Sequence, residues 1–180
     1  MNAVTTEIYD QVIASVGLKP KFLRELRPKF DLVDDWDREF VTITDRSGNN
    51  GVLWIELDRQ IYILPYALSR GIIDKASGRA RPVICDLCYT QQLGTQAARI
   101  ALRLPGRDGA TRSLLCCADL ACSDHVRGKT LSSRRSKAQL RESISQQDRV
   151  ERLRRKLTEL VTELDVKPQI YARVDGSGLV

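Results

Sequence analysis

The sequence predicts an α+β protein in which a small N-terminal part of helices and antiparallel strands precedes a compact cysteine-bearing part and a long C-terminal helix. Three observations lead to this class. Helical spacing of apolar residues gives way to short strand-like runs separated by tight turns. All five cysteines lie within 38 residues of one another. Leucine and valine recur every three or four residues between 150 and 164. We expect one domain over 1–78, a second over 79–164 and a tail over 165–180.

Two helices are predicted at the N-terminal end. The first covers residues 6–16, whose isoleucines and valines recur at helical spacing. Thr5 or Thr6 suits its N-cap, and Gly17 suits its end. The second covers residues 20–30, a segment that starts with proline and contains apolar residues three and four positions apart.

Three strands are predicted next. Runs rich in β-branched and aromatic residues cover 38–44, 52–57 and 60–64, and we expect the last run to end at Pro65. A turn rich in Gly and Asn separates the first two runs, and only two residues separate the last two. Such short connections join antiparallel neighbours. The segment therefore predicts a small antiparallel meander.

A second antiparallel pair is predicted in the C-terminal half. Residues 97–104 alternate, so that Ile100 and Leu102 point to one face of the strand and Arg99 and Arg103 point to the other. A turn containing Pro and Gly follows, and the chain returns as a strand that ends in a cysteine doublet. A short helix comes next. The pair therefore has one face suited to a core and one basic face.

A long C-terminal helix is predicted over residues 137–164. Its second half carries an apolar stripe, which suits packing against the preceding domain. A coiled coil or a free RNA-binding helix is the alternative interpretation of the same stripe. The segment after 164 ends in a Gly-rich stretch and is expected to be a loose tail.

The cysteines form two pairs with the spacing of metal ligands. Cys85 and Cys88 enclose two residues, which lets a tight turn point two thiolates at one ion. Cys117 and Cys122 enclose four residues. In a reducing compartment such clustering favours metal binding over disulfides. We predict that these four thiolates hold one structural Zn²⁺ per chain in a closed tetrahedral site.

Other roles for the cysteines were weighed. Cys116 and Cys117 are neighbours on a strand and point to opposite faces, so Cys116 is expected to pack as a small apolar residue. His125, the only histidine, lies one helical turn after Cys122 and is an alternative ligand. A redox CxxC motif or a set of unrelated buried thiols would also explain a cysteine cluster. The redox motif is expected in a strand–helix–strand setting, which the sequence around Cys85 lacks.

No catalytic motif accompanies the predicted zinc site. The sequence contains no HExxH, GxSxG, P-loop or GxGxxG pattern. A single histidine does not make a catalytic triad. A site closed by four thiolates has no open position for a substrate water. We therefore expect the protein not to be an enzyme.

Composition bounds the class of protein further. Hydrophobic residues make up 42% of the chain, which allows a real core and argues against wholesale disorder. No stretch approaches the roughly 18 uncharged apolar residues that a membrane span requires. The N-terminus lacks the basic and apolar regions of a secretory signal. We expect a monomeric cytoplasmic protein.

The net charge of +6 is unevenly distributed. Residues 79–156 carry 17 Lys and Arg against 7 Asp and Glu, while the segments before and after them are each net −2. A basic middle segment indicates an anionic partner, namely RNA, the ribosome or an acidic protein surface. A solvated basic face that only maintains solubility is the alternative. The candidate partner-binding residues are Arg99, Arg103, Arg112, Arg127 and Lys129.

A zinc knuckle, a hairpin and a helix carrying the last ligand follow in the order of a treble-clef finger. The strings Ile-Cys-Asp-Leu-Cys at 84–88 and Cys-Ala-Asp-Leu-Ala-Cys-Ser at 117–123 are followed by Val-Arg-Gly-Lys at 126–129 and Val-Glu-Arg-Leu-Arg at 150–154. Over about 80–160 these motifs resemble the treble-clef domain of FusB-type elongation factor G-binding proteins, the FBP domain.

The resemblance implies a function as well as a fold. It implies that Cys85, Cys88, Cys117 and Cys122 hold zinc. It also implies that the finger domain contacts elongation factor G on the ribosome, promotes its release and thereby can protect against fusidic acid. FusB proteins that give resistance carry an N-terminal helical bundle, whereas residues 38–64 have the pattern of strands and resemble shorter actinobacterial-type relatives. The alternative function is a zinc-finger module that binds RNA or the ribosome directly.

Overall fold

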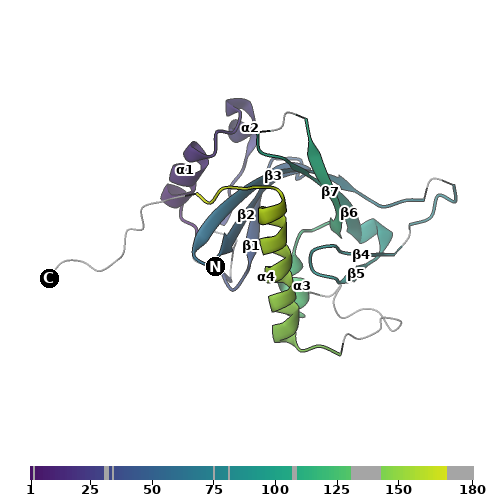
Figure 1. The fold of residues 1–180 in the computed structure, drawn as a ribbon. Coiled ribbons are helices and arrows are strands. Elements are labelled where there is room, and N and C mark those ends of the chain that lie inside the picture. The colour runs from purple at the N-terminus through teal and green to yellow at the C-terminus, as the bar shows by residue number, and fades with distance from the viewer. Residues whose placement is uncertain are drawn as a thin grey trace.

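The computed structural model describes residues 1, 3–30, 33, 35–74, 76–80, 82–106, 109–130 and 143–169. Within these ranges the chain forms an antiparallel sheet with helices on both faces (Figure 1). The α+β class predicted from the sequence is confirmed. None of the helices in the described ranges is long and apolar enough to cross a membrane.

The main sheet of the described residues has five strands, and two short strands form a second sheet beside it. In chain order the elements are α1 (Thr6–Ser15), α2 (Pro20–Glu25), β1 (Phe40–Thr44), β2 (Asn50–Leu57), β3 (Gln60–Arg70), β4 (Val83–Ile84), β5 (Gln91–Gln92), the 3₁₀ turn η2 (Gly94–Gln96), β6 (Ala97–Arg103), β7 (Thr111–Cys117), α3 (Cys122–Val126) and α4 (Gln146–Glu163). The spatial order of the sheet is β1-β2-β3-β6-β7, with all neighbours antiparallel. β4 and β5 pair only with each other.

The sheet crosses the domain boundary that the sequence predicts at residue 78. β3 pairs with β6 from Tyr66 opposite Leu102 to Arg70 opposite Ala98. The core beneath α4 also contains residues from both sides of the boundary. The strands predicted for two separate domains therefore share one sheet.

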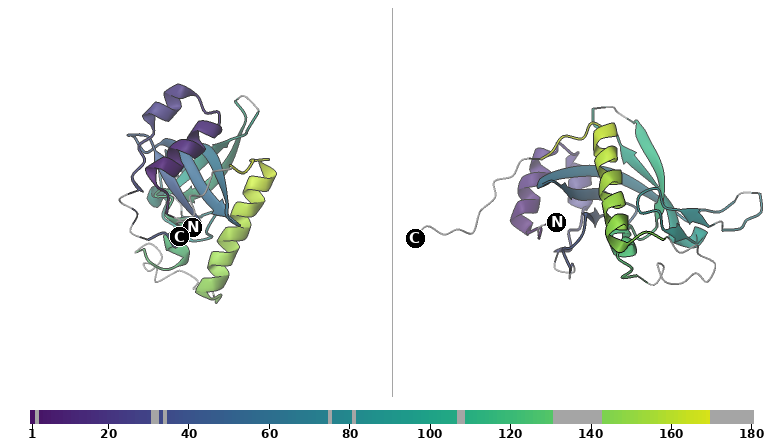
Figure 2. Two further views of the ribbon diagram at one scale, coloured as in Figure 1. Left: turned by 90° about the vertical axis from the view of Figure 1, so that its left-hand side faces the viewer. Right: turned by 60° about the horizontal axis from the view of Figure 1, so that its bottom comes forward.

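Helices cover both faces of the first three strands, as Figure 2 shows. Successive β2 residues alternate between the two faces. Val52 and Trp54 join a cluster with Tyr9 and other residues of α1. Leu53 and Ile55 join the second cluster, which contains the leucines of α4. Double coverage explains why β2 is a nearly continuous apolar run instead of an alternating one.

The N-terminal helices match the prediction in part. The Thr5 hydroxyl accepts the Ile8 N–H at 3.3 Å and caps α1 as expected. Gly17, just after α1, has a positive φ of 67°. α2 is shorter than the predicted 20–30 and ends at Glu25, because the following chain is extended and the Arg27 N–H bonds to Thr44 at 2.8 Å.

The prediction that the third strand ends at Pro65 is wrong, because β3 continues to Arg70. The Leu68 N–H points toward β2, where it bonds to Asn49, and the Gly71 N–H points toward β6, where it bonds to Ala97. Backbone N–H groups of a strand point alternately to its two neighbours, so the nitrogen of Pro65, like that of Gly71, points toward β6. The pairing between β3 and β6 begins only at Tyr66. The missing N–H therefore removes no bond between β2 and β3, and the proline is tolerated.

The C-terminal helix packs on the sheet through its predicted stripe. α4 starts after Ser145, which forms a capping box with Asp148. Residues 137–142 of the predicted helix lie outside the described residues, and residues 143–145 are not helical. Beyond α4 the predicted tail is tied to the sheet as far as it is described, since the Gln169 N–H bonds to Ile61 at 2.7 Å. The buried residues of the stripe are Leu153, Leu157, Leu160, Val161 and Leu164.

Candidate metal centre

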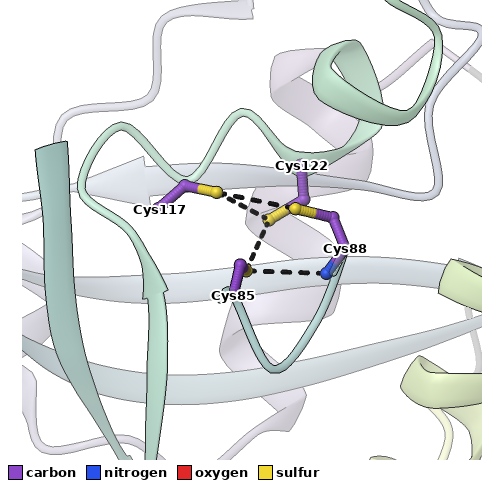
Figure 3. Close-up of side chains that lie close together, drawn as sticks. All are labelled: Cys85, Cys88, Cys117 and Cys122. Atoms are coloured by element: carbon purple, nitrogen blue, oxygen red, sulfur yellow. Dashed lines mark hydrogen bonds between the residues drawn. The ribbon is translucent and has the colours of Figure 1, made fainter. Parts of the chain in front are cut away.

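Three separate segments bring the four predicted cysteines together. Cys85 and Cys88 lie on the loop between β4 and β5, Cys117 ends β7, and Cys122 begins α3. Figure 3 shows their side chains converging from these elements. All four are buried, and their sulfurs lie within 4.8 Å of one another. The paired spacing in the sequence thus corresponds to one cluster in space.

The distances between the sulfurs fit a tetrahedral zinc site. Zn–S bonds of about 2.3 Å place the sulfurs of a tetrahedron about 3.8 Å apart. The observed separations are 3.8 Å for Cys85–Cys122, 3.5 Å for Cys88–Cys117 and 4.0 Å for Cys117–Cys122. A disulfide would need about 2.05 Å. The cluster therefore has the size of a four-thiolate zinc centre and not of a pair of disulfides.

Crowding of the four buried sulfurs shifts the pKa values of the thiols in opposite directions. Hydrogen bonding with Cys117, Cys85 and Cys88, together with burial, raises the pKa of Cys122 well above its ordinary value. Hydrogen bonds from Cys117 and the other two sulfurs lower the pKa of Cys88. These opposite shifts have one origin, since four neighbouring sulfurs cannot all carry a negative charge without a cation among them. Zinc would supply that charge and replace the thiol protons.

Two left-handed residues make the turns that aim the cysteines. Tyr89 follows Cys88 with a φ of 59°, and its N–H closes the knuckle on the Cys85 carbonyl at 2.9 Å. Leu120 has a φ of 53°, and its N–H bonds to the Cys117 carbonyl at 3.1 Å. Because the chain turns at Leu120, Cys122 lies beside the other three cysteines although four residues separate it from Cys117.

Cys116 lies outside the cluster, as predicted. It is fully buried in the core beneath α4, and its sulfur is not among those that converge. Burial raises the pKa of the Cys116 thiol above its ordinary range. A protonated, inaccessible thiol is a poor nucleophile. The geometry thus assigns Cys116 to packing and gives no support to a redox role.

His125 lies against the cluster but has the geometry of a hydrogen-bond donor. Its Nδ1 is 3.1 Å from the Cys117 sulfur, whereas two ligands of one tetrahedral zinc would be about 3.6 Å apart. Its Nε2 is 3.2 Å from a carboxylate oxygen of Asp119. Burial lowers the pKa of His125, but hydrogen bonds to Asp119 and Cys88 outweigh burial and raise this pKa to about 10. The ring therefore supports a ligand instead of replacing one.

The predicted basic residues are divided between two faces of the sheet. Arg99 and Arg103 are exposed on the face opposite α4, and the Arg103 guanidinium lies over the Phe22 ring at 5.3 Å. Arg112 is opposite Leu102, a residue of the core beneath α4, and pairs with Glu163 at 3.3 Å. Arg112 thus does not share the face of the other two, because the register turns it toward α4.

Arg127 differs from the exposed partner contact predicted for it. It is only 8% exposed, and its guanidinium donates to both carboxylate oxygens of Glu39 at 2.8 and 2.9 Å. It also donates to Asp37 at 3.0 Å. Lys129 pairs with Asp35 nearby. These contacts join the segment before β1 to the metal-binding helix, so Arg127 is used internally.

Comparison with known proteins identifies the family. A search of curated proteins and a search of solved structures found no match. The family model described as "FBP C-terminal treble-clef zinc-finger" matches residues 26–164. The match starts well before the cysteines and includes β1, β2 and β3. Because the match covers well over half of the chain, the protein belongs to the FBP C-terminal treble-clef zinc-finger family.

Proposed function

We propose that this protein binds elongation factor G through the exposed face of β6 and β7 and promotes release of the factor from the ribosome. The observation that carries the proposal is the family match over 26–164, together with the resemblance of its cysteine motifs to FusB-type proteins. Protection against fusidic acid would follow from such release. The proposal places the protein in the cytoplasm as a monomeric binding partner without enzymatic activity.

The proposed contact surface is the part of the sheet that faces away from α4. Arg99 lies opposite Leu115, and Arg103 lies opposite Thr111, so these residues share the face with Ala101 between them. Both arginines are exposed, with Leu115 beside Arg99 and the Phe22 ring beneath the Arg103 guanidinium. Arginine forks bind carboxylates in pairs of hydrogen bonds, which suits an acidic surface on a protein partner.

The zinc centre has a structural role in this proposal. Four thiolates complete a tetrahedral site, and no position is left for a substrate. Zinc would fix the β4–β5 loop to the end of β7 and the start of α3. The Asp86 carboxylate strengthens the same junction, since it accepts the Leu115 N–H at 2.7 Å. The centre therefore holds the edge of the proposed surface in place.

A binding titration tests the proposal. Zinc-loaded protein and elongation factor G, both treated with nuclease, are titrated by calorimetry. We expect a complex at micromolar concentrations, and Arg99→Ala with Arg103→Ala should weaken it more than tenfold, which corresponds to about 1.4 kcal/mol. No complex at tens of micromolar of each protein would contradict the proposal.

A matched pair of substitutions controls for net charge. Arg155 and Lys167 have highly exposed side chains on and after α4, so Arg155→Ala with Lys167→Ala removes the same charge elsewhere. We expect less than a threefold effect on binding. Arg154 is a poorer control because its Nε lies 3.7 Å from the buried Glu39. Equal losses from the two pairs would indicate non-specific attraction to a polyanion.

Direct binding of RNA or the ribosome is the second candidate function. The excess of Lys and Arg over 79–156 favours it. Base stacking receives little support, because the Tyr89 ring is covered by the Arg152 guanidinium at 4.5 Å and the Phe22 ring by the Arg103 guanidinium at 5.3 Å. Nuclease treatment separates the candidates, since it abolishes an RNA-mediated complex and leaves a protein complex intact. A steep loss of affinity with salt would favour RNA.

A further inference from the structure

We propose that His125, Asp119 and Gln92 form a hydrogen-bonding shell around the zinc centre that holds the Cys117 thiolate and shields it from electrophiles. His125 and Gln92 act as positioning residues, since they would touch the sulfur and not the metal. The inference concerns the durability of the zinc centre and is independent of the partner that the protein binds.

Two side-chain donors converge on the Cys117 sulfur from outside the cluster. The Gln92 amide nitrogen is 3.3 Å from this sulfur, and the His125 Nδ1 is 3.1 Å from it. The amide nitrogen and the ring nitrogen lie 3.4 Å from each other. Gln92 comes from β5 and His125 from α3, so the sulfur is held from two elements.

Asp119 fixes the direction of the imidazole. Its Oδ2 lies 3.2 Å from Nε2, on the far side of the ring from Cys117. Its Oδ1 accepts the Ala121 N–H at 3.0 Å, which orients the carboxylate in turn. The histidine side chain is fully buried, and Gln92 is 2% exposed. A buried ring between a carboxylate and a thiolate has both acceptors in place and little freedom to rotate.

Hydrogen bonds to a metal-bound thiolate draw electron density away from the sulfur. Such a sulfur is a weaker nucleophile, and residues that orient ligands in this way commonly change metal affinity by 10–100-fold. We therefore expect Cys117 to be among the last of the four ligands to react with an alkylating reagent. Loss of the donors should expose it and speed up the release of zinc.

The test measures zinc release from the zinc-loaded full chain during reaction with N-ethylmaleimide, using a chromogenic chelator. His125→Leu removes the ring donor at similar size, whereas His125→Asn keeps an N–H near the position of Nδ1. We expect His125→Leu to release zinc about tenfold faster, His125→Asn to restore most of the protection, and Gln92→Leu to have a smaller effect. Mass spectrometry of the first alkylated species should show Cys117 modified earlier in His125→Leu.

A packing control separates this role from simple loss of stability. Val126, also buried on α3, makes core contacts, so Val126→Ala lowers the melting temperature without removing a donor. Release rates that depend only on melting temperature across all these variants would overturn the proposal. Equal rates for His125→Leu and His125→Asn would overturn it too.

Cobalt substitution provides an independent readout. Loss of a hydrogen bond to the thiolate should move the sulfur-to-cobalt charge-transfer band to lower energy while the four-sulfur ligand-field bands keep their pattern. Ligand-field bands that change their pattern in His125→Leu would show instead that His125 binds the metal. An unchanged charge-transfer band would show that the donors do not act on the sulfur.

Discussion

The two halves of the sheet differ in how many of their faces are covered. In β2, Val52 and Trp54 lie beneath α1, while Leu53 and Ile55 lie beneath α4. In β6, Ile100 and Leu102 lie in the core beneath α4, while Arg99 and Arg103 on either side of them are exposed. The same strand geometry thus gives a continuous apolar sequence in one half and an alternating sequence in the other.

This difference separates the parts of the molecule that maintain the fold from the part available for recognition. The covered strands and the metal centre form continuous cores, so substitutions there remove packing or ligands. The open face of β6 and β7 carries Arg99 and Arg103 beside Leu115 and smaller side chains, and the opposite face of these strands packs in the core beneath α4. We expect substitutions on this face to change binding far more than they change stability.

Removal of a zinc ligand should have the largest effect. Structural zinc in small domains contributes about 10–16 kcal/mol of apparent binding free energy. We expect Cys85→Ser and Cys117→Ser to lose zinc and the fixed structure around β4, β5 and α3. Metal analysis and amide NMR spectra measure both losses.

Cys116→Ser is the control for these two variants. It places a hydroxyl in the core, which costs about 1–3 kcal/mol, but it leaves all four ligands in place. We expect it to retain one zinc per chain. Loss of zinc in Cys116→Ser with retention in Cys117→Ser would reverse the assignment of the doublet.

Truncation of Trp54 should have the next largest effect. The side chain is fully buried between β2 and α1, where it stacks on Tyr9 at a centroid distance of 6.3 Å. Trp54→Ala should lower the free energy of unfolding by about 3–5 kcal/mol in urea titrations. Trp54→Phe should cost much less, since the indole N–H has no partner among the described residues. A loss below 1 kcal/mol for Trp54→Ala would contradict the two-sided core.

The buried ion pair should come next. Glu39 is 1% exposed and accepts two hydrogen bonds from Arg127. Glu39→Ala leaves the buried guanidinium with the exposed Asp37 carboxylate and the Ser123 carbonyl, so we expect a loss of about 3 kcal/mol. Glu39→Leu with Arg127→Leu removes both charges and should recover much of that stability. If the double variant is less stable than Glu39→Ala, the attraction between Glu39 and Arg127 itself stabilises the fold, and the cost of a single unpaired buried charge does not explain the loss.

The local patterns of the sequence predict much of this fold and most of the metal site. Cysteine spacing predicts all four members of the cluster, because each pair lies within one turn. Period-two alternation places Arg99 and Arg103 on one face. The face of Arg112 does not follow from its own strand, since it depends on the register of the hairpin, which shifts every side chain when it slips by one residue.

Contacts between distant segments are the part that the sequence does not predict. Glu39 and Arg127 are 88 residues apart, and no local spacing links them. An acidic run before the first strand and a basic motif after the last cysteine are the only signals of their meeting. Gln92 approaches the cluster only through the tertiary fold, whereas Asp119 lies between Cys117 and Cys122 in the sequence itself. His125, as the single histidine one turn after Cys122, has a signal, but its role as donor needs the distances to both neighbours.

Truncation of Arg103 should have the smallest effect on stability and thereby gives the sharpest contrast between the two halves. Its guanidinium stacks on Phe22 at 5.3 Å on the exposed face, and contacts of this kind are worth about 0.5–1 kcal/mol. We expect Arg103→Ala to lower the free energy of unfolding by no more than that, and Arg103→Lys, which keeps a cation over the ring, by less. Urea titration of the zinc-loaded variants measures both. A loss near that of Trp54→Ala would mean that α2 depends on this arginine and that the face is part of the core. If Arg103→Ala costs little stability, any weakening of partner binding in this variant is due to the lost contact between Arg103 and the partner.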